Sequence, residues 1–252
     1  MMEKEEDVNV YSPEEIKEKN EEKMKIGLMR NMVEKQVSGC KQQDVDDSTL
    51  RRFLRARDLD VEKASAMFLK YLKWKQTFIP KGFVSASEVG NEIAQNKMFK
   101  QGTDKKGQPV AVVFGARHFM CKGGIDEFKR FLVFSLDKLC SRITDGPEKF
   151  IIIGDLKGYG YRNSDVRGYL AALAILQDYY PERLGKVLVI NAPNIFMTLW
   201  KFIYPFIDKN TRNKIVFVDN KRMKDTLLED IEECQLPEIY GGKLQLVPIQ
   251  DC

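Results

Sequence analysis

The stretch between residues 181 and 219 constrains the fold of this chain more than any other part of the sequence. Two short apolar runs, Val187–Ile190 and Ile215–Val218, are rich in β-branched residues and flanked by polar or turn residues, which is typical of buried parallel strands. Between them lies Ile195–Ile207, in which only a threonine and a lysine are clearly polar. An outer helix of a globular domain needs a polar face, and a membrane span needs about 20 apolar residues. The segment is therefore expected to be buried on every side, or to cover an apolar interior and at times meet a membrane surface.

Segments of strand length alternate with segments of helical periodicity after residue 90. The predicted elements are a hairpin-like strand pair near Met98–Gln101 and Pro109–Gly115, helices Ile125–Arg142 and Ser164–Tyr180 on either side of a strand at Phe150–Ile153, and a short helix at Lys224–Glu232. This alternation predicts an α/β domain with a largely parallel sheet over residues 90–246.

Residues 12–78 have a different pattern, that of three helices. Ser12 and Pro13 open the first helix, Asp46–Ser48 caps the second, and Asp60 caps a third that carries apolar residues at helical spacing to Thr77. The sequence therefore predicts an N-terminal helical annex over residues 12–78.

Composition and charge exclude several classes of protein. A net charge of +4 is too small for a nucleic-acid footprint, but it permits attraction to an anionic membrane leaflet. The acidic start lacks the apolar segment of a secretory signal, and five scattered cysteines without a CxxC pair favour reduced thiols. We expect a cytoplasmic protein. Because lipidation motifs are missing as well, any membrane contact is expected to be transient and peripheral.

Signatures of enzymes and metal sites are missing from the sequence. It contains no P-loop, no complete GxGxxG, no GxSxG and no HExxH. His118 is the single histidine, and with Cys121 it forms an HxxC that has no second pair to complete a four-ligand site. A locally satisfied imidazole is the expected role of His118. The sequence predicts no catalytic residue, no metal site and no cofactor.

Two polar groups are candidates for ligand binding. Asp155-Leu156-Lys157-Gly158 follows a strand at its carboxyl end, where α/β folds tend to place binding residues, although taken alone it favours a capped turn with a surface salt bridge. Thr211 and Lys214 are three residues apart and share a face of a helical turn. A hydroxyl and an ammonium together suit a phosphodiester, and a solvated helix end explains them equally well.

Several motifs occur together in a fixed order: DDSTLRRFLRARDLDVEKA (46–64), TDKKGQPV (103–110), DLKG (155–158), YYPERLGKVLVINAP (179–193), PFIDKNTRNKI (205–215) and YGGK (240–243). Over residues 46–244 they resemble the CRAL-TRIO lipid-binding family, in particular its Sec-fourteen-like phosphatidylinositol transfer branch. The resemblance implies a mostly parallel sheet that floors a phospholipid cavity, packed with the helical annex and closed by a mobile gate helix.

By the same resemblance, the head group of phosphatidylinositol would be bound by Arg57, Glu182, Thr211 and Lys214. The sequence departs from the family pattern at a few positions. Asp58 replaces a lysine beside the annex arginine, Phe150 and Ile152 replace a serine and a threonine that serve phosphatidylcholine, and Ala111 replaces a tyrosine. Phosphatidylinositol binding is therefore expected to be kept and phosphatidylcholine binding to be weakened.

The gate and its hinges are also implied by the resemblance. The hinge points are expected at Gly241 and Gly242 and at the Asn191–Pro193 turn, and the gate residues are Ile195, Phe196, Leu199, Trp200, Phe202, Ile203, Tyr204, Phe206 and Ile207. The implied function is exchange of a bound phospholipid, phosphatidylinositol, with membranes by a monomer that also presents it to a phosphoinositide kinase. Two alternatives stay open: a carrier of a tocopherol, retinoid or sterol, and a nucleotide-using α/β enzyme, which the missing phosphate loops disfavour.

Overall fold

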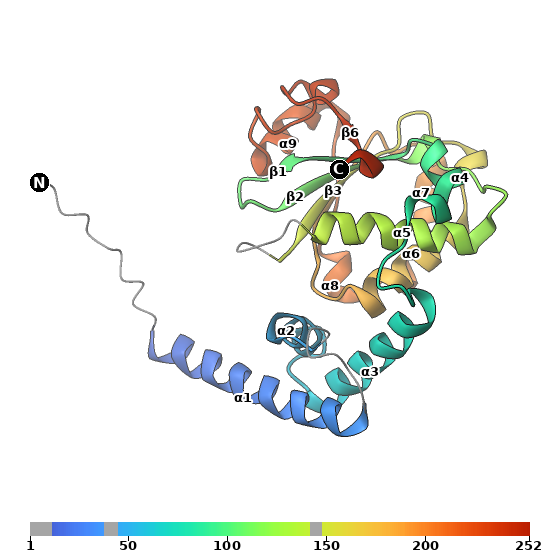
Figure 1. Cartoon of the computed structure of the whole chain (residues 1–252). Helices are drawn as coiled ribbons and strands as arrows, with labels where there is room; N and C mark the ends of the chain where they lie inside the picture. The colour runs from blue at the N-terminus through green and yellow to red at the C-terminus, as the bar shows by residue number, and fades with distance from the viewer. Residues whose placement is uncertain (1–11, 38–44, 142–147) are drawn as a thin grey trace, which may run out of the picture. The chain divides into compact units, whose positions relative to one another are not determined.

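The computed structural model describes residues 12–37, 45–141 and 148–252 (Figure 1). The chain divides into two compact units, Met1–Trp74 and Lys75–Cys252. The boundary falls within helix α3 (Val61–Phe78).

The first unit contains the helices predicted for the annex, α1 (Pro13–Gln36), α2 (Asp47–Arg55) and the greater part of α3. Ser12 and Glu15 form a capping box at the start of α1, and the Asp46 side chain accepts from the Thr49 N–H at the start of α2. One buried face of each helix joins a common apolar core, whose largest members are Met29, Leu50, Phe53, Leu54 and Phe68.

The second unit is built on a sheet with the order β5-β4-β3-β2-β1-β6 among the described residues. Strands β2 to β5 run parallel, whereas β1 is antiparallel to both β2 and β6. The predicted hairpin and the predicted parallel strands are thereby confirmed. The strands are β1 (Met98–Thr103), β2 (Pro109–Phe114), β3 (Phe150–Asp155), β4 (Leu184–Ile190), β5 (Ile215–Phe217) and β6 (Val247–Pro248).

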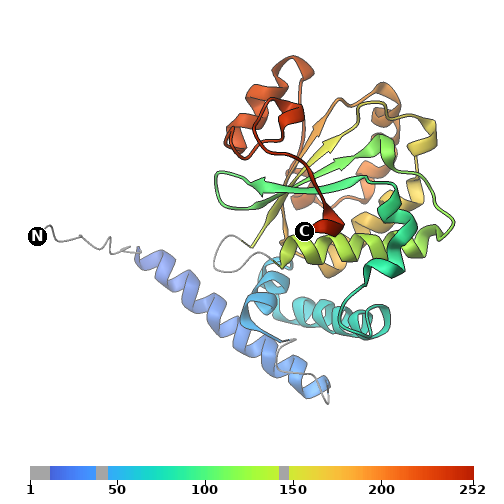
Figure 2. The ribbon, with the colours of Figure 1, turned by 45° about the horizontal axis from the view of Figure 1, so that its top comes forward.

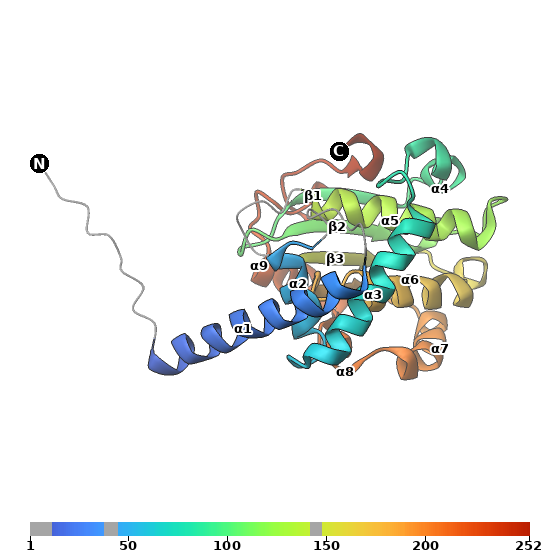
Figure 3. The ribbon, with the colours of Figure 1, turned by 60° about the horizontal axis from the view of Figure 1, so that its bottom comes forward.

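Helices cover the two faces of this sheet. On one face, Leu227 of α9 (Met223–Asp230) packs with the buried side chains of the central strands, among them Ile153 and Leu188 (Figure 1). On the other face, α5 (Gly124–Cys140), α6 (Val166–Tyr179) and α7 (Asn194–Ile203) follow one another as a layer (Figure 3). The C-terminal segment returns to the sheet and places β6 beside β1 (Figure 2).

Some elements differ from the prediction. Strand β5 is an edge strand with half-buried and exposed residues rather than a buried strand. The predicted continuous helix over 195–207 is also wrong: α7 ends at Ile203, and a 3-10 turn, η5 (Tyr204–Phe206), follows. Pro205 explains this, because it has no N–H to donate and its ring clashes with the carbonyl four residues earlier. The predicted end of the 125–142 helix lies outside the described residues.

Several short elements were not predicted from the sequence. Among them are η2 (Ala86–Val89), α4 (Gly90–Ala94), the single-turn helix α8 (Lys209–Arg212) and β6. Each is too short for a hydrophobic period to be read along it.

Candidate functional site

The sheet face that carries α6 and α7 is incompletely covered at its centre. Ile152 in β3 pairs with Val187 in β4, which pairs with Ile215 in β5, and all three are half-buried. Gly154 lies two residues further along β3 and so points to the same face. A Cβ atom placed on Gly154 would have no neighbour within 4 Å. Because parallel strands in mid-sheet are ordinarily covered on both faces, this face keeps apolar surface and open space where a filled core is expected.

Helices α6 and α7 line the same region with apolar side chains that are half-buried. Leu199, Ile203 and Ile207 are buried and pack with Val189 of β4. Around this cluster lie half-buried side chains of both helices, namely Val166, Tyr169, Leu170, Leu173, Ile195, Phe196 and Trp200. The helical layer therefore offers an apolar lining without closing tightly on the sheet.

The segment α7–η5 also has an exposed aromatic face. Phe202 is 58% exposed, Tyr204 43% and Phe206 55%. The half-buried Trp200 ring makes an edge contact with Phe217 of β5, with 5.2 Å between ring centroids. The predicted gate residues thus divide into a set that faces the sheet and a set that faces outward, and both sets are apolar.

Charged side chains gather at the amino edge of the sheet. Lys149, Glu182 and Lys214 each lie just before a parallel strand, β3, β4 and β5, so the topology brings them to one place. The Glu182 carboxylate lies 3.3 Å from Lys149 Nζ and 3.9 Å from Lys214 Nζ. Glu182 has φ +58°, a conformation that disfavours a residue with a side chain and is often found at functional sites.

Thr211 lies one turn before Lys214, and its carbonyl accepts from the Lys214 N–H at 3.1 Å. Its hydroxyl donates to Asp208 Oδ2 at 2.6 Å, while its backbone N–H donates to Asp208 Oδ1 at 2.8 Å. Asp208 therefore caps α8 and holds the threonine hydroxyl. The lone pairs of that oxygen stay available to a ligand that donates.

The structure brings together three of the sequence-predicted head-group residues, Glu182, Thr211 and Lys214. Arg57 belongs to the first unit, where its guanidinium donates to the Ala56 carbonyl at 2.8 Å. Lys149 was not predicted. The available signal was its position directly before a strand, the same position that Lys214 occupies.

Gly241 and Gly242 lie in a tight hydrogen-bonded turn. Gly241 has φ +83°, and a Cβ on Gly242 would lie 2.1 Å from the Leu236 carbonyl oxygen. Both glycines are thus required by local backbone geometry, and their role as hinges stays a prediction.

Asp155 is buried and accepts hydrogen bonds from three segments of the chain, rather than forming a surface salt bridge. Its carboxylate accepts from the Lys157 N–H, from Asn191 Nδ2 and from the Tyr240 hydroxyl, at 2.9, 2.8 and 2.9 Å. The predicted capped turn is confirmed. In addition, Asp155 ties the end of β3 to Asn191, which precedes α7.

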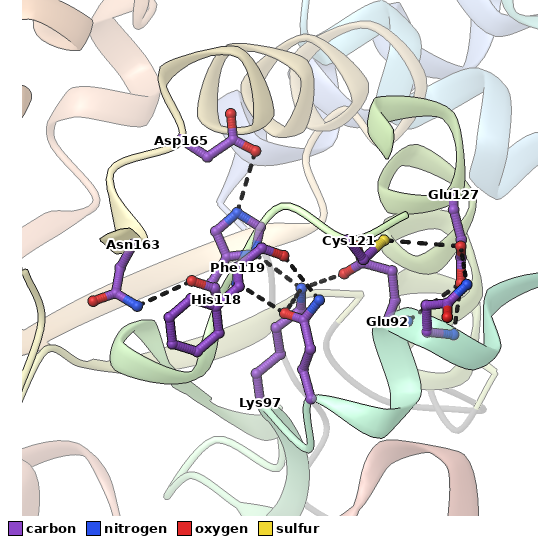
Figure 4. A network of polar contacts seen from close by, with 10 residues as sticks. Glu92, Lys97, His118, Phe119, Cys121, Glu127, Asn163 and Asp165 are labelled. Atoms are coloured by element: carbon purple, nitrogen blue, oxygen red, sulfur yellow. Dashed lines mark hydrogen bonds and ion pairs between the residues drawn. The ribbon is translucent and has the colours of Figure 1, made fainter. Parts of the chain in front are cut away.

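A second polar network surrounds His118 (Figure 4). Lys97 Nζ pairs with the Glu92 carboxylate and lies 2.9 Å from His118 Nδ1, and His118 Nε2 lies 3.4 Å from Asp165 Oδ2. Glu92, Lys97 and His118 are all buried, and burial lowers the pKa of both Lys97 and His118. The prediction that the His118 imidazole has hydrogen-bonding partners is confirmed, although these partners are distant in the sequence rather than local.

Cys121 completes this network and is not an activated thiol. Its sulfur donates to Glu92 Oε1 at 3.0 Å. Burial, together with the Glu92 carboxylate, raises the pKa of Cys121 to about 11, so the thiolate is disfavoured. Cys234 and Cys252 are free thiols as well, and Cys40 lies outside the described residues.

Within the described ranges, no helix has the length and apolar character needed to cross a membrane. The same residues place no group of three or more His, Cys, Asp or Glu side chains so that it could hold a metal ion.

Comparison with known proteins assigns the family. Residues 94–242 match the model of the CRAL/TRIO domain, and residues 14–70 match that of the CRAL/TRIO N-terminal domain. The chain belongs to the CRAL/TRIO family.

Relatives within the CRAL/TRIO family are Sec14-like. The Sec14 cytosolic factor of Schizosaccharomyces pombe is 35% identical over 225 residues, which cover 80% of this chain and 76% of that protein. The SEC14 cytosolic factor of Kluyveromyces lactis is 30% identical over 244 residues, or 90% of this chain and 80% of that protein. The crystal structure of Sfh5 has a similar fold, with a TM-score of 0.66 at 20% identity over 82% of this chain and 83% of that one.

Family membership confirms the resemblance, the fold and the broad class that the motifs predicted. The chain is a Sec14-like CRAL-TRIO protein of the lipid-binding and transfer class. The lipid species and the roles of individual residues stay predictions.

Proposed function

We propose that this CRAL/TRIO protein binds phosphatidylinositol and exchanges it with membranes. The acyl chains would lie between the central strands and helices α6 and α7. The observation that carries this proposal is the uncovered sheet face, where Ile152 and Val187 are half-buried and no atom lies within 4 Å of a Cβ placed on Gly154. Such a face suits an apolar ligand that fills the open space, because protein interiors are otherwise packed to high density.

The tails of the ligand explain why a gate is needed. A diacyl lipid carries about thirty methylenes, so exposing its tails to water would cost about 20 kcal/mol at ~0.8 kcal/mol each. The protein must therefore open while it touches the bilayer. The exposed Phe202, Tyr204 and Phe206 suit that contact, because aromatic rings favour the membrane–water boundary.

The amino-edge cluster is the proposed site of the head group. Lys214 and Lys149 offer ammonium groups for a phosphodiester, and Glu182, which lies beside both lysines, can accept from inositol hydroxyls. The Thr211 oxygen can accept from an inositol hydroxyl while its own hydroxyl hydrogen is donated to Asp208 Oδ2. We place Arg57 in a supporting role.

Phosphatidylcholine is proposed to bind weakly. Ala111 and Ile152 are register neighbours on the sheet, and both carry purely apolar side chains at positions where the family pattern has hydroxyl groups. A choline phosphate would find no hydrogen-bond donor there, and its desolvation would go uncompensated.

The proposed cycle involves no covalent chemistry. A cytoplasmic monomer visits a membrane transiently, exchanges its lipid, and presents phosphatidylinositol to a lipid kinase. The cycle requires no catalytic residue and no resident cofactor.

The first test identifies the ligand and its location. Lipid extraction and mass spectrometry of the purified protein should yield phosphatidylinositol, whereas a tocopherol, retinoid or sterol would replace the proposal with a different carrier. Gly154→Ile should fold normally, because its side chain enters open space, and should reduce the bound lipid several-fold. Gly27→Leu is the control, since Gly27 also has open space around a built Cβ but lies in α1. Full lipid content in Gly154→Ile would exclude this site.

The second test concerns the head group. Transfer of labelled phosphatidylinositol between vesicles should fall about tenfold or more in Thr211→Asp/Lys214→Ala, because loss of a charge-assisted hydrogen bond costs about 1.5–3 kcal/mol. Lys209→Ala, on the same short helix and exposed, serves as the control. Equal rates for the double variant and the wild type would eliminate the assignment. Phosphatidylcholine transfer as fast as that of phosphatidylinositol would contradict the argument from Ala111 and Ile152.

A further inference from the structure

We propose that two loops at the carboxyl edge of the sheet form a second membrane-docking surface, which binds an anionic bilayer. The loops are residues 115–123, which follow β2, and residues 156–164, which follow β3. Together they are called the carboxyl-edge tip.

The tip exposes large apolar side chains at its end. Met120 is 70% exposed, Tyr161 88% and Phe119 43%. Exposed apolar side chains that cluster in this way mark interaction sites, and a methionine and aromatic rings can insert among lipid head groups.

The charge of the tip is entirely positive. It contains Arg117, Lys122, Lys157 and Arg162, all exposed, and no Asp or Glu. Two of the acids that border it are held by partners within the protein: Asp155 accepts from the buried Tyr240 hydroxyl, and Asp165 accepts from the Gly168 N–H. Asp126, three residues after the first loop, is exposed and pairs with Lys129. Cations that surround apolar side chains complement an anionic leaflet, whose surface potential attracts them.

The two loops are held together before any partner arrives. Asn163 Nδ2 donates to the carbonyls of Ala116 and His118, each at 3.0 Å, and so joins the loops. The Gln95 side chain exchanges two hydrogen bonds with the Phe119 backbone, at 2.9 and 3.0 Å. A surface ordered in advance loses little conformational entropy on docking.

The position of the tip relates it to lipid exchange. Asp155, directly before the second loop, accepts from Asn191, which lies two residues before Pro193, the N-cap of α7. The tip thus borders the point where the predicted gate begins. The inference rests on the proposed function in one respect, namely that the protein visits membranes.

The experiment compares vesicle binding by the full chain and two matched variants. Lys122→Gln/Tyr161→Ser removes one cation and one exposed ring from the tip, and Lys81→Gln/Phe83→Ser removes the same groups elsewhere, at exposed positions. The probes are phosphatidylcholine vesicles with and without phosphatidylserine. The tip variant should bind the phosphatidylserine vesicles at least roughly five-fold more weakly, the share expected from one cation, and the control variant should bind like the wild type.

The lipid content of each variant is measured in parallel. A tip variant with normal lipid content and weak docking supports the proposal, whereas missing phospholipid in the wild type would count against the proposed function alone. Unchanged binding to phosphatidylserine vesicles overturns the proposal and would point to an acidic protein partner. An equal loss in the control variant overturns it too. Lys122→Gln/Arg162→Gln, which alters only exposed cations, repeats the test without the ring.

Discussion

His118, the single histidine of the chain, makes the free energy of unfolding depend on pH near neutrality. In the folded protein, burial and the nearby Lys97 ammonium lower the pKa of His118 from its ordinary 6.5. The unfolded chain therefore binds a proton that the folded chain does not. This contribution to stability is present above pH 6.5 and is lost as the pH falls toward the folded pKa, by up to about 1.4 kcal/mol per pH unit.

The prediction is checked by urea denaturation of wild type and His118→Gln between about pH 7.5 and 5.5, a window in which histidine is the side chain that ordinarily titrates. The wild type should lose more stability on acidification. Asp137, whose pKa is raised by burial, acts in the opposite sense in both proteins and cancels in the comparison. Parallel pH profiles would show that His118 is protonated equally in both states.

Single residues mark the limit of what could be predicted from sequence. The lone histidine without a metal-ligand partner was enough to predict a satisfied imidazole. Its partners Lys97 and Asp165, and Glu92 behind Lys97, are brought together by tertiary contacts between α4, the residue before β1 and the N-cap of α6, and no local sequence pattern reports such contacts. Asp155 was assigned to a turn correctly, but its burial depends on Tyr240, which is 85 residues away.

At the scale of elements, the two faces of α7 are expected to have separable roles. Ile203 is 7% exposed and packs toward the sheet, whereas its neighbour Phe202 is 58% exposed. Ile203→Ala should lower the free energy of unfolding, or the free energy that holds α7 against the sheet, by about 2–4 kcal/mol. The first loss would be seen as a lower urea midpoint and the second as faster proteolysis within residues 194–207. Phe202→Ala should leave stability within about 0.5 kcal/mol and slow lipid transfer several-fold. Equal effects of both variants on transfer and on stability would contradict this division.

Helices and strands long enough to show a repeating hydrophobic pattern were predicted well from the sequence, and shorter elements were not. The apolar runs of β2 to β4 and the helices α5 and α6 were visible because their residues repeat over many positions. The sequence also contained Pro205, yet the aromatic run concealed that α7 stops before it. Strand β6 is two residues long and is defined only by its partner β1.

For the whole molecule, bound lipid should add to stability. A ligand that covers the apolar surface of the interior stabilises the folded state. At a free concentration of one hundred times its Kd, such a ligand adds about 2.7 kcal/mol to the free energy of unfolding. For a chain of this size that corresponds to a rise in Tm of roughly 5–10 °C. Thermal melts of delipidated protein before and after reloading with phosphatidylinositol vesicles measure it, with Gly154→Ile as the control that should not respond. A Tm that ignores lipid would argue against an internal ligand.

The candidate site was predictable in part, for a topological reason. Thr211 and Lys214 are close in sequence, so their proximity needed no knowledge of the fold. Glu182 and Lys149 join them because three parallel strands begin side by side, which is known only once strand order is known. General experience with α/β sheets favoured the carboxyl edge, whereas the charged cluster lies at the opposite one.

The length of the central strands has a consequence for the choice of cargo. Strand β4 is seven residues long, about 23 Å at ~3.3 Å per residue, while one leaflet contributes about 15 Å of hydrocarbon to a membrane. Under the proposed function, the length of the sheet limits the length of the acyl chains that the protein accepts. Tails of ordinary biological length fit between its two rims, and markedly longer ones would project past the far rim and be rejected.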